Sequence, residues 1–198
     1  KKKNIMKNTI IALSILAALA FTQCTNNAPA ADTDATAAPT EETLTQRGEY
    51  LVGILGCHDC HSPKKMGPQG PELIPELMLS GYPADRPFGK VNKEALAEGW
   101  ALFNGDLTAG VGPWGATFAA NITSDASGIG EWSLEQFTRA LTQGKAKGME
   151  DGRPLLPPMP WFNYTNMKPE DIEAIYTYLQ STKPVRNVVP APIGPEAL

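Results

Sequence analysis

Five consecutive residues, Cys57-His58-Asp59-Cys60-His61, carry the most specific chemistry in the sequence. Two thiols three positions apart can reach the two vinyl groups on one edge of a porphyrin and form two thioethers. The imidazole of the adjacent His61 can then bind the iron from one side. The C-x-x-C-H spacing is the attachment signature of haem c. Cys57, Cys60 and His61 are therefore predicted to hold one covalently bound haem.

Two other uses of this motif fit the sequence less well. A redox-active C-x-x-C disulfide does not need the following His61, and the chain lacks the βαβ pattern that would support one. A zinc site needs four ligands, but the sequence has three Cys and two His residues in total. The cysteine outside the motif, Cys24, falls at a predicted export signal.

The second axial ligand of the iron is predicted to be a methionine, because the other histidine, His58, lies inside the attachment motif. Met159 is the first candidate. It stands in Leu155-Leu156-Pro157-Pro158-Met159-Pro160-Trp161. The prolines hold this segment extended and stiff, so that the thioether is presented at little entropic cost. The remaining candidates are Met78 and Met149.

Residues 1–23 have the pattern of an export signal. Four lysines precede the apolar run Thr9–Thr22, which is shorter than the roughly 20 residues of a membrane span. Cys24 follows, and here the sequence resembles a bacterial lipoprotein signal, in which this Cys becomes the lipid-modified first residue. An uncleaved anchor helix and ordinary cleavage nearby are the alternatives. Residues 24–42 lack large apolar side chains and are predicted to be a flexible tether.

The charge balance excludes one class of partner. The hydrophobic share is 42% and the formal net charge is −4; loss of residues 1–23 removes four lysines and no acid, which takes the charge to −8. An acidic chain lacks the basic footprint of a nucleic-acid-binding protein. It is steered instead towards a redox partner with a basic face.

Hydrophobic periodicity and capping residues predict three helices. They cover about residues 42–55, a segment that begins at the capping box Ser133–Gln136 and ends at Gly144, and a segment that begins at Pro169. A weaker helical stretch lies near Lys93–Phe103. No strand alternation persists, so an all-α fold is expected, with long Gly- and Pro-rich loops wrapped around the haem. The globular domain is placed at 43–192, followed by a C-terminal tail at 193–198.

The chain resembles class I c-type cytochromes, in particular the haem c domains in cytochrome subunits of periplasmic alcohol dehydrogenases. The resemblance covers about residues 43–192. Besides the C-x-x-C-H motif, it rests on Arg47–Leu51, Ala120–Asp125, Gly128–Ser133, Asp151–Pro154, Pro158–Trp161 and Glu170–Leu179.

The resemblance implies a fold in which the first and last helices cross beside the haem. It also implies that a backbone carbonyl in a Gly-Pro-x-Leu segment accepts the Nδ1–H of His61. Gly70-Pro71-Glu72-Leu73 fits that pattern, so Pro71 is the predicted acceptor, with Gly67-Pro68 as a rival.

An iron with both His61 and Met159 bound has no free position for a substrate, so the chain is expected to be an electron carrier and not an enzyme. The expected role is to shuttle electrons, on the periplasmic side of the cell envelope, from a quinol-oxidising complex or a dehydrogenase to a terminal oxidase or reductase. A single C-x-x-C-H motif and the lack of a C-terminal membrane helix favour a separate carrier. A fixed dehydrogenase subunit is the alternative; a peroxidase or gas sensor would need an open iron position. A basic docking rim is predicted at Lys64, Lys65, Lys145, Lys147 and Arg153.

The first prediction concerns the anchor. If Cys24 is acylated, the wild-type protein should fractionate with membranes, and Cys24→Ser should release or mislocalise it. Fractionation followed by immunoblotting measures this. A wild-type protein found wholly in the soluble periplasmic fraction would contradict the lipid anchor.

Overall fold

The computed structural model describes residues 41–198, which belong to one unit. The predicted export signal 1–23, the lipidation site Cys24 and the tether up to residue 40 lie outside the described residues. Among the helices of residues 41–198, none is both long enough and apolar enough to cross a bilayer.

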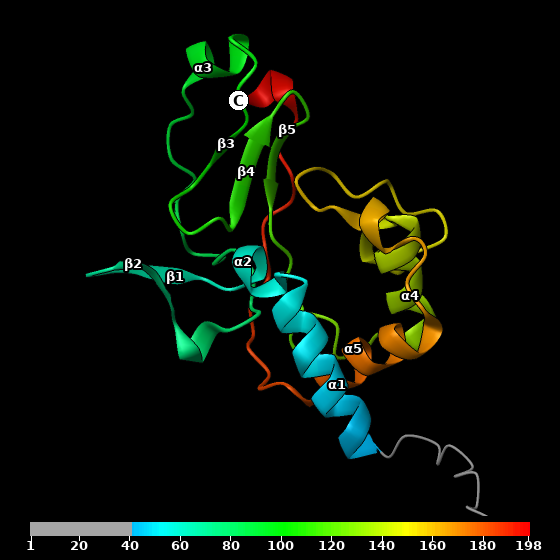
Figure 1. Cartoon of the computed structure of the whole chain (residues 1–198). Helices are drawn as coiled ribbons and strands as arrows, with labels where there is room; N and C mark the ends of the chain where they lie inside the picture. The colour runs from blue at the N-terminus through cyan, green and yellow to red at the C-terminus, as the bar shows by residue number, and fades with distance from the viewer. Residues whose placement is uncertain (1–40) are drawn as a thin grey trace, which may run out of the picture. The chain divides into compact units, whose positions relative to one another are not determined.

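Within residues 41–198 the chain forms five α-helices and four short 3-10 helices (Figure 1). The α-helices are α1 (Glu41–Ile54), α2 (Cys57–His61), α3 (Lys93–Ala97), α4 (Leu134–Gln143) and α5 (Pro169–Ser181). The 3-10 helices are η1 (Pro75–Leu77), η2 (Ala146–Gly148), η3 (Trp161–Tyr164) and η4 (Pro195–Ala197).

The three predicted helices are confirmed as α1, α4 and α5. Ser133 caps α4, since its Oγ accepts the Gln136 N–H at 3.1 Å, and Gly144 ends the helix in the left-handed conformation with φ of 62°. Pro169 opens α5. The weaker stretch 93–103 is helical only at α3.

The prediction of an all-α fold is wrong, because the described residues include two antiparallel sheets. One is the hairpin of β1 (Lys64–Gly67) and β2 (Gly70–Leu73). The other has the order β3 (Leu102–Phe103), β4 (Ala109–Gly112) and β5 (Gly115–Phe118). Each strand has two to four residues. Runs this short, with β4 buried at every position, cannot display the polar–apolar alternation by which a strand is recognised.

The helical part of the unit is built on the packing of α1 against α5, as the resemblance implies. Val52 of α1 and Ile172, Ile175 and Leu179 of α5 are buried in one apolar cluster with Phe137 of α4. Leu79 and Ile129 complete this cluster from the loops. Burial of such side chains stabilises the fold by about 1.5–3 kcal/mol each.

The three-stranded sheet is bound to two other parts of the chain, the C-terminal segment and the segment around Arg86. Ala116 of β5 exchanges two backbone hydrogen bonds with Ile193, at 2.8 and 2.9 Å, so residues from the predicted tail 193–198 pair with the sheet. The Asp106 carboxylate, in the β3–β4 connection, is 8% exposed and accepts from Arg86 Nη1 at 2.7 Å and Thr108 Oγ1 at 2.7 Å. Burial alone would raise the pKa of Asp106, but these hydrogen bonds outweigh it and lower that pKa.

The α1–α5 crossing depends on Gly48. A Cβ at this position would lie 1.9 Å from the Ala174 carbonyl oxygen of α5, so Gly48→Ala should force the helices apart and lower the free energy of unfolding by about 1–3 kcal/mol or more. Gly53→Ala is the matched control on the same helix, because its Cβ would meet nothing within 4 Å. It should be neutral or stabilising by up to about 1 kcal/mol. Chemical denaturation measures both, and equal destabilisation would contradict the close approach.

Asp106 should make stability depend on pH. Its folded pKa lies below the usual 3.8, so its contribution is complete at neutral pH and is lost as the pH falls through the folded pKa. Asp106→Asn should therefore lower the free energy of unfolding by about 1–3 kcal/mol at pH 7, and this difference should shrink below about pH 4. The exposed Asp85→Asn is the control. A wild-type–variant difference that does not change with pH would contradict the assignment.

Candidate functional site

The attachment motif forms its own short helix, α2, directly after α1. Gly56 separates the two in the left-handed conformation, with φ of 69°, which glycine adopts without steric cost. The chain can therefore turn between Ile54 and Cys57 and begin a new helix. Within α2, Cys57 and Cys60 are one turn apart and His61 is the last residue.

The orientation of His61 is set by a backbone carbonyl. Its Nδ1 lies 2.7 Å from the Ala120 carbonyl oxygen. A carbonyl can only accept, so Nδ1 carries the proton and donates it, and Nε2 keeps a free lone pair in the neutral ring. Burial lowers the pKa of His61 and keeps the ring neutral, although the Ala120 hydrogen bond acts in the opposite direction.

The acceptor differs from the predicted one. Pro71 lies in the β1–β2 hairpin, opposite Met66, and the structure places Ala120, which follows β5, at the His61 nitrogen. The Gly-Pro-x-Leu segment is part of a strand pair that leads away from α2 (Figure 1). Its carbonyls are therefore not the ones presented to the ring.

Residues 79–82 link the end of α2 to the segment that follows β5. The Gly81 N–H donates to the His61 carbonyl at 2.8 Å, and the Tyr82 N–H donates to the Ala119 carbonyl at 2.9 Å. A Cβ on Gly81 would lie 2.4 Å from the Ala119 oxygen. Only glycine fits at this crossing, and the crossing fixes the distance between His61 and its acceptor.

His58 is directed to a different part of the site. Its Nδ1 lies 2.9 Å from Ser62 Oγ, which also accepts the Leu79 N–H at 2.9 Å. Ser62 is fully buried. His58 thus has a local structural partner, which agrees with the expectation that His61 and not His58 is the iron ligand.

The two thiols of α2 are held in the protonated form. Burial, assisted by the charge of Asp59, raises the pKa of Cys57 to about 11, and the same two causes raise the pKa of Cys60. Redox-active and nucleophilic cysteines have lowered pKa values. The local electrostatics are therefore opposite to those of a C-x-x-C disulfide catalyst.

The segment of Met159 joins the three-stranded sheet to the surroundings of the cysteines. The Thr117 hydroxyl of β5 donates to the Pro157 carbonyl at 2.7 Å, and Pro158 packs against the backbone of Gly110 in β4. Beyond Met159, η3 ends at Tyr164. Burial raises the pKa of this tyrosine, and ionisation of Cys57 or Cys60 would raise it further, because the two thiols lie nearby.

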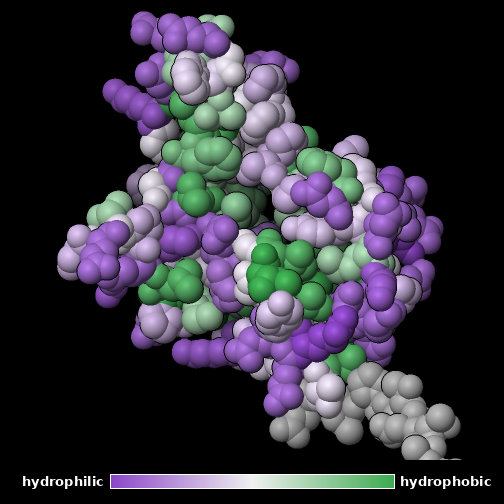
Figure 2. Space-filling model, in the orientation of Figure 1, coloured by the Kyte–Doolittle hydropathy of each residue, from purple (hydrophilic) through white to green (hydrophobic). Residues whose placement is uncertain are grey.

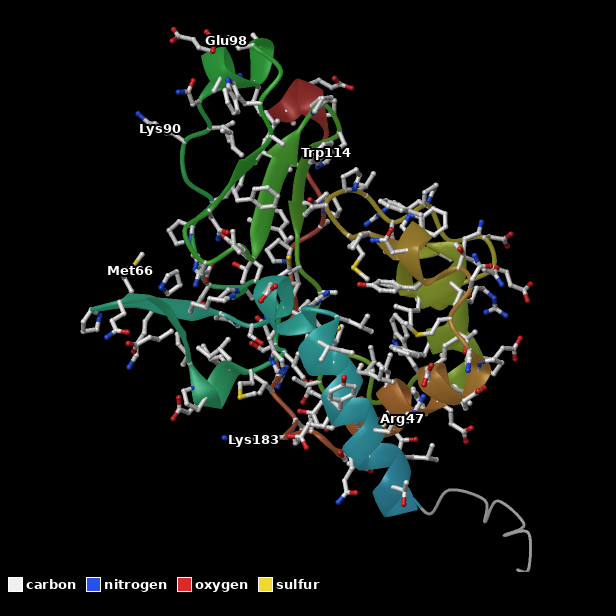
Figure 3. All side chains as sticks on the ribbon, in the orientation of Figure 1. Arg47, Met66, Lys90, Glu98, Trp114 and Lys183 are labelled. Carbon is white, nitrogen blue, oxygen red and sulfur yellow. The ribbon has the colours of Figure 1, made fainter. Side chains whose placement is uncertain are left out.

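The other methionines occupy different environments. Met167 packs against the apolar core. Met149 is 58% exposed beside η2, while Met78 is partly buried after η1. Met66 is 74% exposed on the projecting β1–β2 hairpin (Figure 3). Met159 is partly buried and is the methionine whose segment is tied to β4 and β5.

The predicted basic rim is altered at one position. Lys64 Nζ is bonded to four backbone carbonyl oxygens, so this charge is turned into the protein. Lys65 and Lys147 are exposed, Lys145 is partly buried, and exposed Arg153 donates to the Pro154 carbonyl at 2.9 Å.

The donor set fits haem c. Cys57 and Cys60 offer two protonated thiols on one helix, and His61 offers a neutral imidazole with Nε2 free. Figure 2 shows a hollow next to α2, between the β3–β5 sheet and the segment around residues 144–164, with hydrophobic residues beside it. In the part of the chain that the structure describes, no three His, Cys, Asp or Glu side chains come together as a metal-ion site.

Three contributors to the site were missed by sequence reasoning. Ala120 acts through its main chain, which leaves no signal in residue type, although it begins the resemblance motif Ala120–Asp125. Thr117 lies in a strand that was not predicted. Lys64 was read as a surface charge, because nothing in its residue type distinguishes a bonded lysine from a solvated one.

Several known proteins are similar to the chain in sequence. No family model matches the chain. The fructose dehydrogenase cytochrome subunit of Gluconobacter japonicus is 28% identical over 161 residues, which are 80% of this chain and 26% of that protein. The alcohol dehydrogenase (quinone) cytochrome c subunit of Gluconobacter oxydans is 29% identical over 147 residues, 73% of this chain and 23% of that protein.

A third relative is the gluconate 2-dehydrogenase cytochrome c subunit of Pantoea cypripedii, 30% identical over 138 residues, 69% of this chain and 23% of that protein. The chain spans about a quarter or less of the length of the curated relatives it matches. With these similarities over most of its length, the chain is a cytochrome c domain similar to those of dehydrogenase cytochrome subunits.

Proposed function

We propose that the chain is an electron-transfer protein that carries one haem c, attached through Cys57 and Cys60 and ligated by His61 and Met159. The observation that carries the proposal is the His61 Nδ1–Ala120 hydrogen bond beside the two thiols. It leaves Nε2 as the one ring atom able to bind iron. The bound group supplies a one-electron Fe(III)/Fe(II) couple, and a thioether ligand raises its potential.

His61 and Met159 would hold the haem iron, and the bound group would supply one-electron chemistry there. His61 is oriented by Ala120 and by the Gly81 link to α2. The Met159 segment is held through Pro157 by Thr117. A site restrained on both sides reorganises little during electron transfer and leaves no position for a substrate, so we assign no catalytic activity to the chain.

The proposed setting is the periplasmic side of the cell envelope, with a lipid anchor at Cys24. The leader pattern of residues 1–23 predicts export, and covalent attachment would keep the cofactor on a protein outside the cytoplasm. The names of the relatives support a dehydrogenase as electron donor. The acceptor would be a terminal oxidase or reductase.

A fixed subunit of a dehydrogenase complex is the second candidate. Two observations favour it: the relatives are named as dehydrogenase subunits, and Trp100 and Phe103 are 63% and 48% exposed near the start of the three-stranded sheet. Hydrophobic residues gather over this sheet (Figure 2). A carrier should purify as a single chain, whereas a subunit should purify with a dehydrogenase and lose it on Phe103→Ser.

Covalent attachment tests the proposed function most simply. Haem staining should survive denaturing electrophoresis of the wild-type protein, because thioether bonds are not broken by denaturation. The double variant Cys57→Ser, Cys60→Ser should lose the stain. Cys24→Ser, matched in chemistry, should keep it. A stain that persists in the double variant would contradict the attachment site.

The axial assignment predicts a specific pattern among methionine variants. Met159→Ala and Met159→His should both keep the haem, which depends on α2. The Ala variant should bind CO and gain weak peroxidase activity, and the His variant should stay six-coordinate with a lower potential, since imidazole favours ferric iron. Near-infrared spectra and potentiometry measure these changes. The assignment would be contradicted if Met159→Ala kept the near-infrared band of a methionine ligand. Loss of that band in Met78→Ala or Met149→Ala would assign the ligand to that residue instead.

A further inference from the structure

The side chain of Lys64 contacts several backbone carbonyls at the C-terminal end of α2. Lys64 Nζ lies 2.7 Å from the Asp59 carbonyl oxygen, 3.0 Å from that of Ser62 and 3.3 Å from that of His58. It also lies 3.0 Å from the Asp106 carbonyl oxygen. The last carbonyls of a helix have no partner within the helix. Here the Lys64 ammonium group supplies a partner to the Asp59 and Ser62 carbonyls. It adds a second partner to the His58 carbonyl, which also accepts the Ser62 N–H at 3.2 Å.

From these contacts we propose that Lys64 is a positioning residue, a fixed cation that holds the attachment helix for His61 and raises the redox potential of the site. The inference rests on the proposed function. The three α2-side carbonyls that Lys64 binds come from residues on both sides of Cys60 and His61. The cation is therefore built into the segment that carries the iron ligand.

Two physical effects follow from one charge. An ammonium group at a helix C-terminus offsets the partial negative charge of the terminal carbonyls and restrains the last turn. A nearby positive charge also disfavours the ferric form relative to the ferrous form, because reduction removes one positive charge from the iron. Since Lys64 Nζ is bonded to carbonyls and is not free in solvent, salt screens its effect only partly.

Lys64 also connects the site to the three-stranded sheet. Its Nζ binds the Asp106 carbonyl, and its backbone N–H donates to Asp106 Oδ2 at 3.4 Å. The same carboxylate is held by Arg86 and Thr108. The end of α2 is thus anchored to a buried network and not to a solvent-exposed loop.

The chain offers a matched control at the next position. Lys65 has the same formal charge and lies on the same strand, and successive strand residues point to opposite faces. It is exposed, so water and salt should screen its charge. Lys64→Met and Lys65→Met remove one charge each, and Lys64→Arg keeps the charge in a different shape.

The experiment is spectroelectrochemical titration of the haem-loaded wild type and these three variants, at low and high ionic strength. Amide hydrogen exchange of residues 57–64 is measured in parallel. Lys64→Met should lower the midpoint potential at both ionic strengths and speed exchange at the end of α2. Lys64→Arg should restore most of the potential. Lys65→Met should change the potential slightly at low salt, not at high salt, and leave exchange unchanged.

Equal potentials in Lys64→Met and Lys65→Met, or equal shifts in Lys64→Met and Lys64→Arg, would overturn the inference. If Lys64→Met does not acquire covalent haem, the fraction of protein that carries haem is measured in each variant instead. Loading restored by Lys64→Arg supports the cation, and failure of both Lys64 variants beside a loaded Lys65→Met refutes it. Absence of covalent haem from the wild type would instead refute the proposed function.

Discussion

The hydrogen bond from His61 to the Ala120 carbonyl is the constraint on which the rest of the site depends. It joins the end of α2 to the segment that leaves β5, across 59 positions of the chain. It also selects the tautomer, so that Nε2 of the neutral ring keeps its lone pair. The close passage of Gly81 keeps these two segments at a fixed separation. The left-handed Gly56 lets α2 begin directly after α1, and Lys64 ties the end of α2 to Asp106.

The helical half of the fold could be predicted from the sequence, and the sheets could not. The ends of α4 and the start of α5 are predicted by Ser133, Gly144 and Pro169, because helix caps and helix-breaking residues act locally on the backbone. The strands are too short to show a period, and their pairing is set by contacts remote in sequence, such as that of Ala116 with Ile193. Segments expected to be irregular loops instead pair with one another as short strands.

For the site, residue type predicted the groups that would carry chemistry, and only the fold shows what orients them. The motif from Cys57 to His61 can be recognised in the sequence because haem attachment requires this spacing of two thiols and an imidazole. The acceptor for His61 is a main-chain atom, and any residue can provide one, so a pattern drawn from resemblance led to Pro71 when the structure uses Ala120. Lys64 illustrates the same limit, since its four carbonyl partners depend on the path of the chain after α2.

An optical redox titration of the purified wild-type protein, with CO added to the reduced form, tests the central claim most directly. A single one-electron transition is expected, with a weak near-infrared charge-transfer band in the ferric state and no CO binding at neutral pH. That result corresponds to one iron held by an imidazole and a thioether. Ready CO binding by the reduced wild type would show an open iron position and would contradict the account of a closed electron-transfer site.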